Sequence, residues 1–291
     1  MIKVKVPATS ANLGVGFDCM GLAVSLYSNV YFEKSSQILE ISGCPKEFQT
    51  SQNLIYQAFV KGCQYLGQSI PNVKITIENK IPMARGLGSS AFCIVAGLEG
   101  ANEWFGHPLS KNDLLDLATQ MEGHPDNVAP AIFGNLAVSF KNEDNSVQTS
   151  NFKIAKNLHF IALIPNYQVS TKKAREILPS NMSYKTVSYQ VGHAVVLSKA
   201  LEDGDFNLIK TSIVDKMHEP FRSQLIPDYQ HAKQLCEENN GLMYISGSGS
   251  TMMGMTADQK DADEIFSAAK KDFPNWEVLR LNVDHHGVVV E

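Results

Sequence analysis

The segment with the clearest potential for chemistry is the glycine- and serine-rich stretch at residues 82–91. Before it, residues 73–77 alternate apolar and polar side chains like a half-buried strand, and after it residues 91–98 repeat apolar side chains with the period of a helix. A helix N-terminus collects unpaired N–H groups and the positive end of the helix dipole, so this order favours an anion such as phosphate. Gly86 and Gly88 would let the backbone approach that anion closely.

Other interpretations of this segment stay open on its residues alone. A glycine-rich turn can merely connect a strand to a helix. Gly86, Gly88 and Ala91 also fit the G-x-G-x-x-A spacing of a dinucleotide fingerprint, although about eighty residues precede it and no second strand ending in an acid follows the helix. A Walker A loop is excluded, because no Gly-Lys-Ser or Gly-Lys-Thr occurs.

A second polar cluster lies near the start of the chain, at residues 7–18, which are rich in small and turn-forming residues. It could be a wide hairpin connection. It could also present Asn12 and Asp18 to a polar ligand. Asp18 has no basic neighbour in its own loop, so it is suited to an ammonium group.

A third cluster, residues 122–127, follows a helix that a capping-box-like pattern starts at Ser110. It could simply be a helix end that Gly123 closes and Pro125 stops. However, the carboxylate of Glu122 would be repelled by the negative end of that helix dipole. A nearby cation would remove the repulsion.

Composition and charge narrow the class of protein. The chain has 291 residues, enough for one large domain or two medium ones, and 44% hydrophobic with 19% charged residues is ordinary for a globular protein. A net charge of -5 gives no electrostatic reason to expect nucleic acid or an anionic membrane. Five cysteines without a C-x-x-C pair argue against a disulfide scaffold or zinc site and favour a cytoplasmic protein. No apolar run approaches the length of a membrane span.

The elements expected around these clusters mix strands and helices. The patterns predict strands over residues 1–6, 22–32, 39–42, 73–77, 134–140, 158–164, 242–245, 252–256 and 276–283. They predict helices over residues 54–66, 89–103, 110–122, 171–178, 186–201, 229–238 and 262–271, with another starting near 206. A polar stretch at residues 141–150 is expected to be an exposed turn near a domain boundary. This mixture favours an α+β fold.

Four separated motifs, at residues 7–18, 82–91, 122–127 and 246–251, occur together in this chain. In these motifs the sequence resembles the GHMP family of small-molecule kinases over essentially its full length, and most closely the homoserine kinases. The resemblance implies an α+β, two-domain GHMP kinase fold, usually a homodimer. Its N-terminal, ATP-binding domain, like domain 2 of ribosomal protein S5, would span residues 1–150, and a ferredoxin-like C-terminal domain would span residues 151–291.

The same resemblance implies a reaction. ATP and Mg²⁺ would be the cofactors of a transfer of the γ-phosphate to the side-chain hydroxyl of L-homoserine, a step in threonine biosynthesis. The small-molecule substrate would be the partner, with no nucleic acid or membrane involved. In the family the glycine loop wraps the ATP phosphates; its residues here, with Thr171 near the phosphates, are Pro82, Met83, Ala84, Arg85, Gly86, Leu87, Gly88, Ser89, Ser90 and Ala91.

Further roles follow residue by residue. By resemblance, Ser90 and Glu122 hold the metal ion, which would explain the position of Glu122. The residues expected to bind homoserine are Asn12, Asp18, Asn127, Arg175 and Arg222. Guanidinium groups suit the carboxylate because they donate paired, geometrically fixed hydrogen bonds, although each arginine could instead form a surface salt bridge. Asp126 and Asn127 lie where the resemblance puts the reacting hydroxyl, and Asp126 is the candidate base if one exists.

Two positions depart from the family pattern: Ser250 stands where proline is usual, and Phe92 where a small residue is common.

Two other functions remain as alternatives, a non-catalytic nucleotide-binding protein on the same fold and a dinucleotide-dependent oxidoreductase. His285 and His286 lack the further ligands of a metal site and are expected to be solvated.

Overall fold

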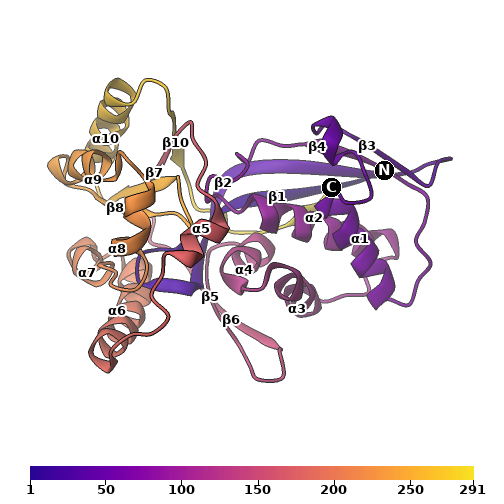
Figure 1. Ribbon diagram of the computed structural model, residues 1–291, viewed down its shortest axis with the longest axis horizontal. Helices are drawn as coiled ribbons and strands as arrows, with labels where there is room; N and C mark the ends of the chain where they lie inside the picture. The colour runs from indigo at the N-terminus through magenta and orange to yellow at the C-terminus, as the bar shows by residue number, and fades with distance from the viewer.

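The structure is a computed structural model that describes all residues, 1–291, and contains two β-sheets with helices packed on them (Figure 1). The first sheet has the order β11-β1-β2-β4-β3, and β5 pairs with β2 and β6. Its strands are β1 (Ile2–Asn12), β2 (Gly16–Lys34), β3 (Leu39–Ser42), β4 (Val73–Glu78), β5 (Leu136–Lys141), β6 (Val147–Phe152) and β11 (Val289–Val290). All pairs are antiparallel except β3 with β4, so the parallel sheet of a dinucleotide-binding fold is absent.

The second sheet is antiparallel throughout and has the order β10-β7-β9-β8. Its strands are β7 (His159–Ile164), β8 (Leu242–Ile245), β9 (Met252–Thr256) and β10 (Glu277–Leu281). Two helices, α9 (Tyr229–Glu238) and α10 (Gln259–Asp272), pack on it around a core that includes Leu235, Cys236 and Ile265. Separate sheets with their own helices confirm the α+β prediction.

Four helices cover the first sheet: α1 (Leu54–Tyr65), α2 (Ser89–Trp104), α3 (Lys111–Glu122) and α4 (Pro125–Phe133). The middle of α2 is buried on nearly all sides and packs against β1 and the other three helices. Gly97 permits its close contact with α1, since a Cβ there would lie 2.2 Å from the Ile55 carbonyl oxygen. Helix α2 is therefore fixed in the core, and its N-terminus begins at the predicted glycine loop.

The remaining helices follow β7 in the chain and precede β8, two strands of the second sheet. They are α5 (Thr171–Glu176), α6 (Tyr184–Asp203), α7 (Phe206–Ser212) and α8 (Glu219–Arg222), with the 3₁₀ turn η2 (Ser223–Leu225). A second 3₁₀ turn, η1 (Lys46–Phe48), lies between β3 and α1. None of the helices combines the length and the hydropathy needed to cross a bilayer. The turn between β1 and β2 extends beyond the first sheet and lies beside α6 and α8 (Figure 1).

Several elements differ from the sequence prediction. Residues 7–12, predicted as part of a loop, continue β1, because bulges at Pro7/Ala8 and Ala11/Asn12 keep them paired with β2. Helix α3 ends at Glu122 with Gly123 as its cap, as expected, but the patterns did not predict α4, which begins at Pro125, where the missing N–H group costs nothing. The segment from 141 to 150 contains most of β6, which pairs with β5 as a hairpin. The short helix α8 replaces the turn expected at residues 218–222.

Candidate functional site

A cavity of about 950 Å³ lies where the two halves of the chain meet, and both halves line it. Most of the predicted site residues line it together: Asn12, Asp18, Met83, Ala84, Arg85, Gly86, Gly88, Ser89, Ser90, Glu122, Asp126, Asn127, Thr171, Arg175 and Arg222. Three predicted residues are not among its lining. The side chains of Leu87 and Ala91 lie in the core, and Pro82 precedes the part of the loop that faces the cavity. The exposed His285 and His286 also lie outside it.

The glycine loop delivers the N-terminus of α2 to the cavity. Gly88 is the residue before the helix and has φ 71°, and it provides no side chain to cap the first turn. A Cβ at this position would lie 2.0 Å from Thr9 Oγ1. Arg85 donates from Nε to the Pro165 carbonyl and from Nη2 to the Asn166 carbonyl, both at 3.0 Å, which ties the loop to the second half. The first-turn N–H groups of α2 are therefore suited to an anion.

Ser90 and Glu122 meet at the edge of this loop. Ser90 Oγ donates to Glu122 Oε2 at 2.6 Å. Burial raises the pKa of Glu122, and the hydrogen bond from Ser90 opposes that rise. A hydroxyl and a carboxylate are oxygen ligands of the kind Mg²⁺ takes, and a cation would compensate the burial of the carboxylate. The pair fits the predicted metal site.

The side of the cavity that the resemblance assigns to the amino acid contains two arginines and one aspartate. Arg175 donates from Nη1 and Nη2 to the two oxygens of Asp18, at 3.0 and 2.9 Å, in a bidentate pair. Arg222 is 3% exposed, donates to the Ala174 and Gly247 carbonyls, and has no carboxylate within 4.0 Å. Burial, followed by the nearby charge of Arg175, lowers the pKa of Arg222 to about 10. Arg222 is thus a buried cation without a carboxylate in direct contact, which favours an anionic ligand.

Asp126 and Asn127 lie at the start of α4, between the arginines and the glycine loop. Asn127 Oδ1 accepts a hydrogen bond from Thr9 Oγ1 at 2.8 Å, and its amide donates to Asp126 at 3.3 Å. His124 is hydrogen-bonded to Asp126 through Nδ1. Burial alone would lower the pKa of His124, but its hydrogen bond and charge interaction with Asp126 raise it. Asp126 is consequently hydrogen-bonded to His124 rather than a free carboxylate.

The far end of the cavity has a largely apolar lining, and the sequence patterns did not identify it. The apolar side chains are Cys44 from the loop after β3, Phe48 of η1, Ile55 of α1, Ile77 of β4 and Phe92 and Cys93 of α2, and the polar Glu47, Asn53 and Asn79 lie beside them. Phe92, a departure from the family pattern, thus contributes to this wall. The only local signal was Asn53, which caps α1 by accepting from the Ile55 N–H at 2.9 Å and also lines the cavity. An apolar end beside an anion site suits a nucleotide base.

Two residues of the third glycine loop, Gly247 and Ser248, also line the cavity. Thr171 Oγ1 lies 3.4 Å from Ser248 Oγ, so the start of α5 and this loop are neighbours. Ser250, where proline is usual, donates its hydroxyl to the Tyr167 carbonyl at 2.6 Å. That hydrogen bond anchors the loop at the position where proline would have restricted φ.

Comparison with known proteins agrees with this geometry. The family models for the GHMP kinase N-terminal and C-terminal domains match residues 53–135 and 197–275. The chain belongs to the GHMP kinase family. Relatives named homoserine kinase from Clostridium botulinum (strain ATCC 19397 / Type A) and Clostridium beijerinckii are 42% and 38% identical to it, over 100% of this chain and 98% of each relative. The predicted family is confirmed.

Solved structures show the same fold. The crystal structure of homoserine kinase from Cytophaga hutchinsonii matches with a TM-score of 0.89 and 30% identity, covering 100% of this chain and 97% of that one. A mevalonate kinase, at 13% identity and a TM-score of 0.73, covers 98% and 99% and shares the fold. The chain is therefore a phosphotransferase of the GHMP type, which excludes the oxidoreductase alternative.

A buried carboxyl group lies beneath Arg222. Glu219, in the first turn of α8, accepts a hydrogen bond from the Ile245 N–H at 2.6 Å. Burial raises its pKa from 4.5 to about 8, so the carboxyl is mostly protonated at neutral pH in the folded protein and ionised in the unfolded chain. Its contribution to stability is fully present below about pH 4.5 and is lost as the pH rises to about 8.

The variant Glu219→Gln tests this coupling, because an amide does not titrate. We expect the free energy of unfolding of the wild type to fall relative to the variant between pH 5 and 8, by up to about 1.4 kcal/mol per pH unit. Urea denaturation of both proteins at unit intervals of pH measures the difference between their free energies of unfolding. The titration of all other groups is common to both proteins and cancels in this difference. A difference that is constant with pH would rule out the raised pKa.

Proposed function

We propose that the chain transfers the γ-phosphate of ATP to the side-chain hydroxyl of L-homoserine, which gives ADP and O-phospho-L-homoserine on the route to threonine. The observation that carries this proposal is Arg222, a buried guanidinium without a carboxylate partner, next to the Arg175–Asp18 pair and in the same cavity as the glycine loop. The relatives named homoserine kinase, similar over the full chain, support it.

The amino-acid side is complementary to a zwitterion. A carboxylate can take the guanidinium donors of Arg222 and Arg175, and an ammonium can take the carboxylate oxygens of Asp18. The bidentate Arg175–Asp18 pair would exchange its internal hydrogen bonds for these, so no charge is left buried without a partner. Mevalonate carries no ammonium group and would leave Asp18 without a ligand cation.

The phosphate side of the cavity fits ATP and Mg²⁺. The residues that would hold the nucleotide are the glycine loop, the first turn of α2 and the apolar end around Phe48, and those that would hold the metal ion are Ser90 and Glu122. When bound, the metal ion supplies positive charge that offsets the charge developing on the phosphate oxygens. Thr171 and Ser248 close the cavity from the second half.

The reacting hydroxyl would lie near Asp126 and Asn127. Phosphoryl transfer passes through a loose transition state with little bonding to the nucleophile, so positioning and charge neutralisation contribute more than a strong base. Asp126, paired with His124, is a hydrogen-bond acceptor that can orient the hydroxyl and take its proton late. Asn127 accepts a hydrogen bond from Thr9 and donates its side-chain amide to Asp126, so its orientation is fixed beside that carboxylate.

Replacing Arg175 by alanine tests the amino-acid site. We expect the KM for L-homoserine to rise about 10- to 100-fold, because a charged, bidentate interaction is lost, and the KM for ATP to change less than twofold. A coupled ADP assay with L-homoserine, other hydroxy amino acids and mevalonate measures both. Lys172→Ala, on the exposed face of the same helix, is the control. Equal rises in the two KM values would show that Arg175 does not belong to the substrate site. Turnover of mevalonate alone would contradict the assignment of L-homoserine as the substrate.

Replacing Glu122 by glutamine tests the metal site. The amide keeps the shape and a hydrogen bond to Ser90 but loses the charge, so we expect half-maximal activity to need at least tenfold more Mg²⁺. Glu103→Gln, near the other end of α2, is a charge-matched control and should leave the Mg²⁺ requirement unchanged. Wild-type Mg²⁺ dependence in Glu122→Gln would exclude this carboxylate from the metal ligands.

We further propose a homodimer through α6. Three valines spaced four residues apart, Val187, Val191 and Val195, expose 40%, 59% and 68% of their surface along one face of this helix. Burial of this stripe against a second copy would remove it from water. We expect Val191→Glu with Val195→Glu to sediment as a monomer while the wild type sediments as a dimer. Ile38→Glu, at an exposed hydrophobic residue outside α6, is the control and should sediment as the wild type does. A monomeric wild type would contradict the proposal.

A further inference from the structure

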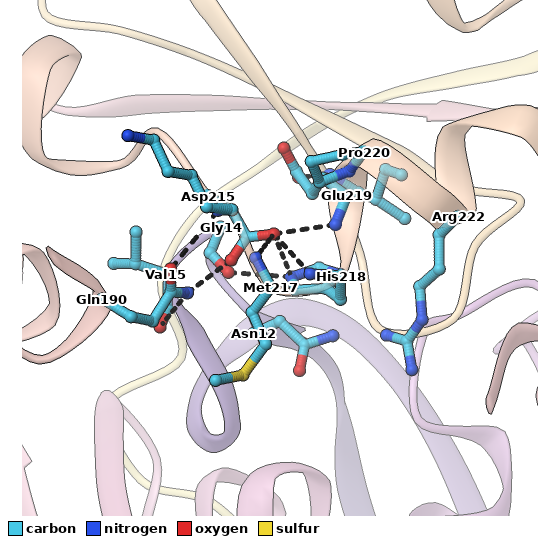
Figure 2. Close-up of polar contacts among 12 residues, drawn as sticks. Asn12, Gly14, Val15, Gln190, Asp215, Met217, His218, Glu219, Pro220 and Arg222 are labelled. Carbon is cyan, nitrogen blue, oxygen red and sulfur yellow. Dashed lines mark hydrogen bonds and ion pairs between the residues drawn. The ribbon is translucent and has the colours of Figure 1, made fainter. Parts of the chain in front are cut away.

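A buried polar cluster lies behind the amino-acid side of the cavity and is formed by Gln190 of α6 with Asp215 and His218, which precede α8 (Figure 2). The carboxylate of Asp215 accepts hydrogen bonds from the N–H groups of Met217, His218 and Glu219 at 3.1, 2.7 and 2.7 Å, and from the amide of Gln190. None of the three cluster residues lines the cavity. The cluster therefore has no direct contact with a ligand there.

The cluster instead binds the turn between β1 and β2. Gln190 Nε2 donates to the Val15 carbonyl at 3.0 Å, and His218 Nε2 lies 2.8 Å from the Gly14 carbonyl oxygen (Figure 2). A carbonyl oxygen only accepts, so Nε2 of His218 carries the proton. Burial lowers the pKa of His218, which keeps the ring neutral, and its Nδ1 has no partner. The second half of the chain thus holds the turn through two buried donors.

The turn needs such external support because its backbone is unfavourable. Asn12, Leu13 and Asp18 have φ values of 74°, 41° and 58°, in the left-handed region that non-glycine residues rarely adopt. Gly14 has no room for a side chain, since a Cβ would lie 2.2 Å from the Ile213 carbonyl oxygen. Two of the three strained residues, Asn12 and Asp18, are the predicted ligands of the substrate. Their positions therefore depend on contacts that the turn does not provide itself.

The same histidine also supports an aromatic ring under both arginines. The ring of Phe17 packs against the ring of His218, with centroids 5.4 Å apart. The guanidinium carbons of Arg222 and Arg175 lie 5.0 and 5.8 Å from the centroid of Phe17. Cations over an aromatic face are attracted by its quadrupole. Phe17 therefore links the position of His218 to the position of the two groups suited to the carboxylate.

We propose that Gln190, Asp215 and His218 are positioning residues for the amino-acid substrate. They fix the turn at residues 13–15, and through it they fix Asn12 at the end of β1 and Phe17 and Asp18 at the start of β2, without touching the ligand. Asp215 holds the start of α8 and the amide of Gln190, and His218 and Gln190 hold the turn. The proposal rests on the proposed function only in taking an amino acid as the ligand.

Kinetics of His218→Leu and His218→Gln test the proposal. Leucine removes the donor to Gly14, and glutamine keeps a donor at about the position of Nε2. We expect His218→Leu to raise the KM for L-homoserine at least tenfold and the KM for ATP less than twofold, and His218→Gln to stay within threefold of the wild type. An unchanged KM for L-homoserine in His218→Leu, or equal rises in both KM values, would overturn the proposal.

A control variant and hydrogen exchange distinguish the proposed positioning role from a merely structural role of the cluster. Asn102→Ala removes a buried amide that hydrogen-bonds Leu109 in the first half, so it should lower the melting temperature without changing the ratio of the two KM values. In His218→Leu and in the milder Gln190→Leu, we expect amide exchange to accelerate at residues 13–18 at least tenfold more than in β4. If exchange accelerated equally across the chain, or did not accelerate, in whichever of the two variants folds, the positioning role would be refuted.

The exchange measurement also separates this proposal from the proposed function. If the wild-type protein formed no ADP with L-homoserine, the proposed function would fail, and exchange at residues 13–18 would still decide whether the cluster fixes the turn. If the wild type is active and exchange in the variants is unchanged, the positioning role fails and the function stands.

Discussion

The carbonyl group of Gly247 is the point on which the two halves of the site depend. It accepts hydrogen bonds from Asn12 Nδ2 and from Arg222 Nη1, both at 2.9 Å, and the N–H of the same residue donates to the Ala11 carbonyl at 3.1 Å. One residue of the third glycine loop therefore fixes the end of β1 and the buried guanidinium together. Since the glycine loop comes from the first half and the arginines from the second, a displacement here would move the proposed phosphate and amino-acid sides of the cavity apart.

Recognition in this site depends on local charges rather than on the charge of the whole chain. The net charge is -5, yet the cavity presents two guanidinium groups, a helix N-terminus and loop N–H groups to anionic ligands. The acids of the site are each placed beside a partner: Asp18 with Arg175, Asp126 with His124 and Glu122 with Ser90. Such pairing keeps charges in a largely buried cavity without a large electrostatic cost.

Local patterns were sufficient for most of the elements and for the motifs, and insufficient for contacts between distant segments. The capping box at Ser110 and the helix at residues 229–238 were predicted as found, because their signals lie within a few residues. The continuation of β1 through residues 7–12 was missed, because bulges depend on the partner strand. The apolar end around Phe48 and the contact of Gln190 with Val15 were also missed, because their partners are remote in sequence.

The pairing of β11 with β1 has a consequence for biosynthesis. Val289 and Val290 pair with Lys5 and Val4, and the backbone groups of Glu291 and Lys3 are hydrogen-bonded, so residues 289–291 complete the edge of a strand that lies far before them in the sequence. During translation, β1 has an open edge until residues 289–290 have left the ribosome, even when the helices of the first half have already packed on its sheet. An emerging chain of this protein therefore has a long interval in which that edge can pair with other chains.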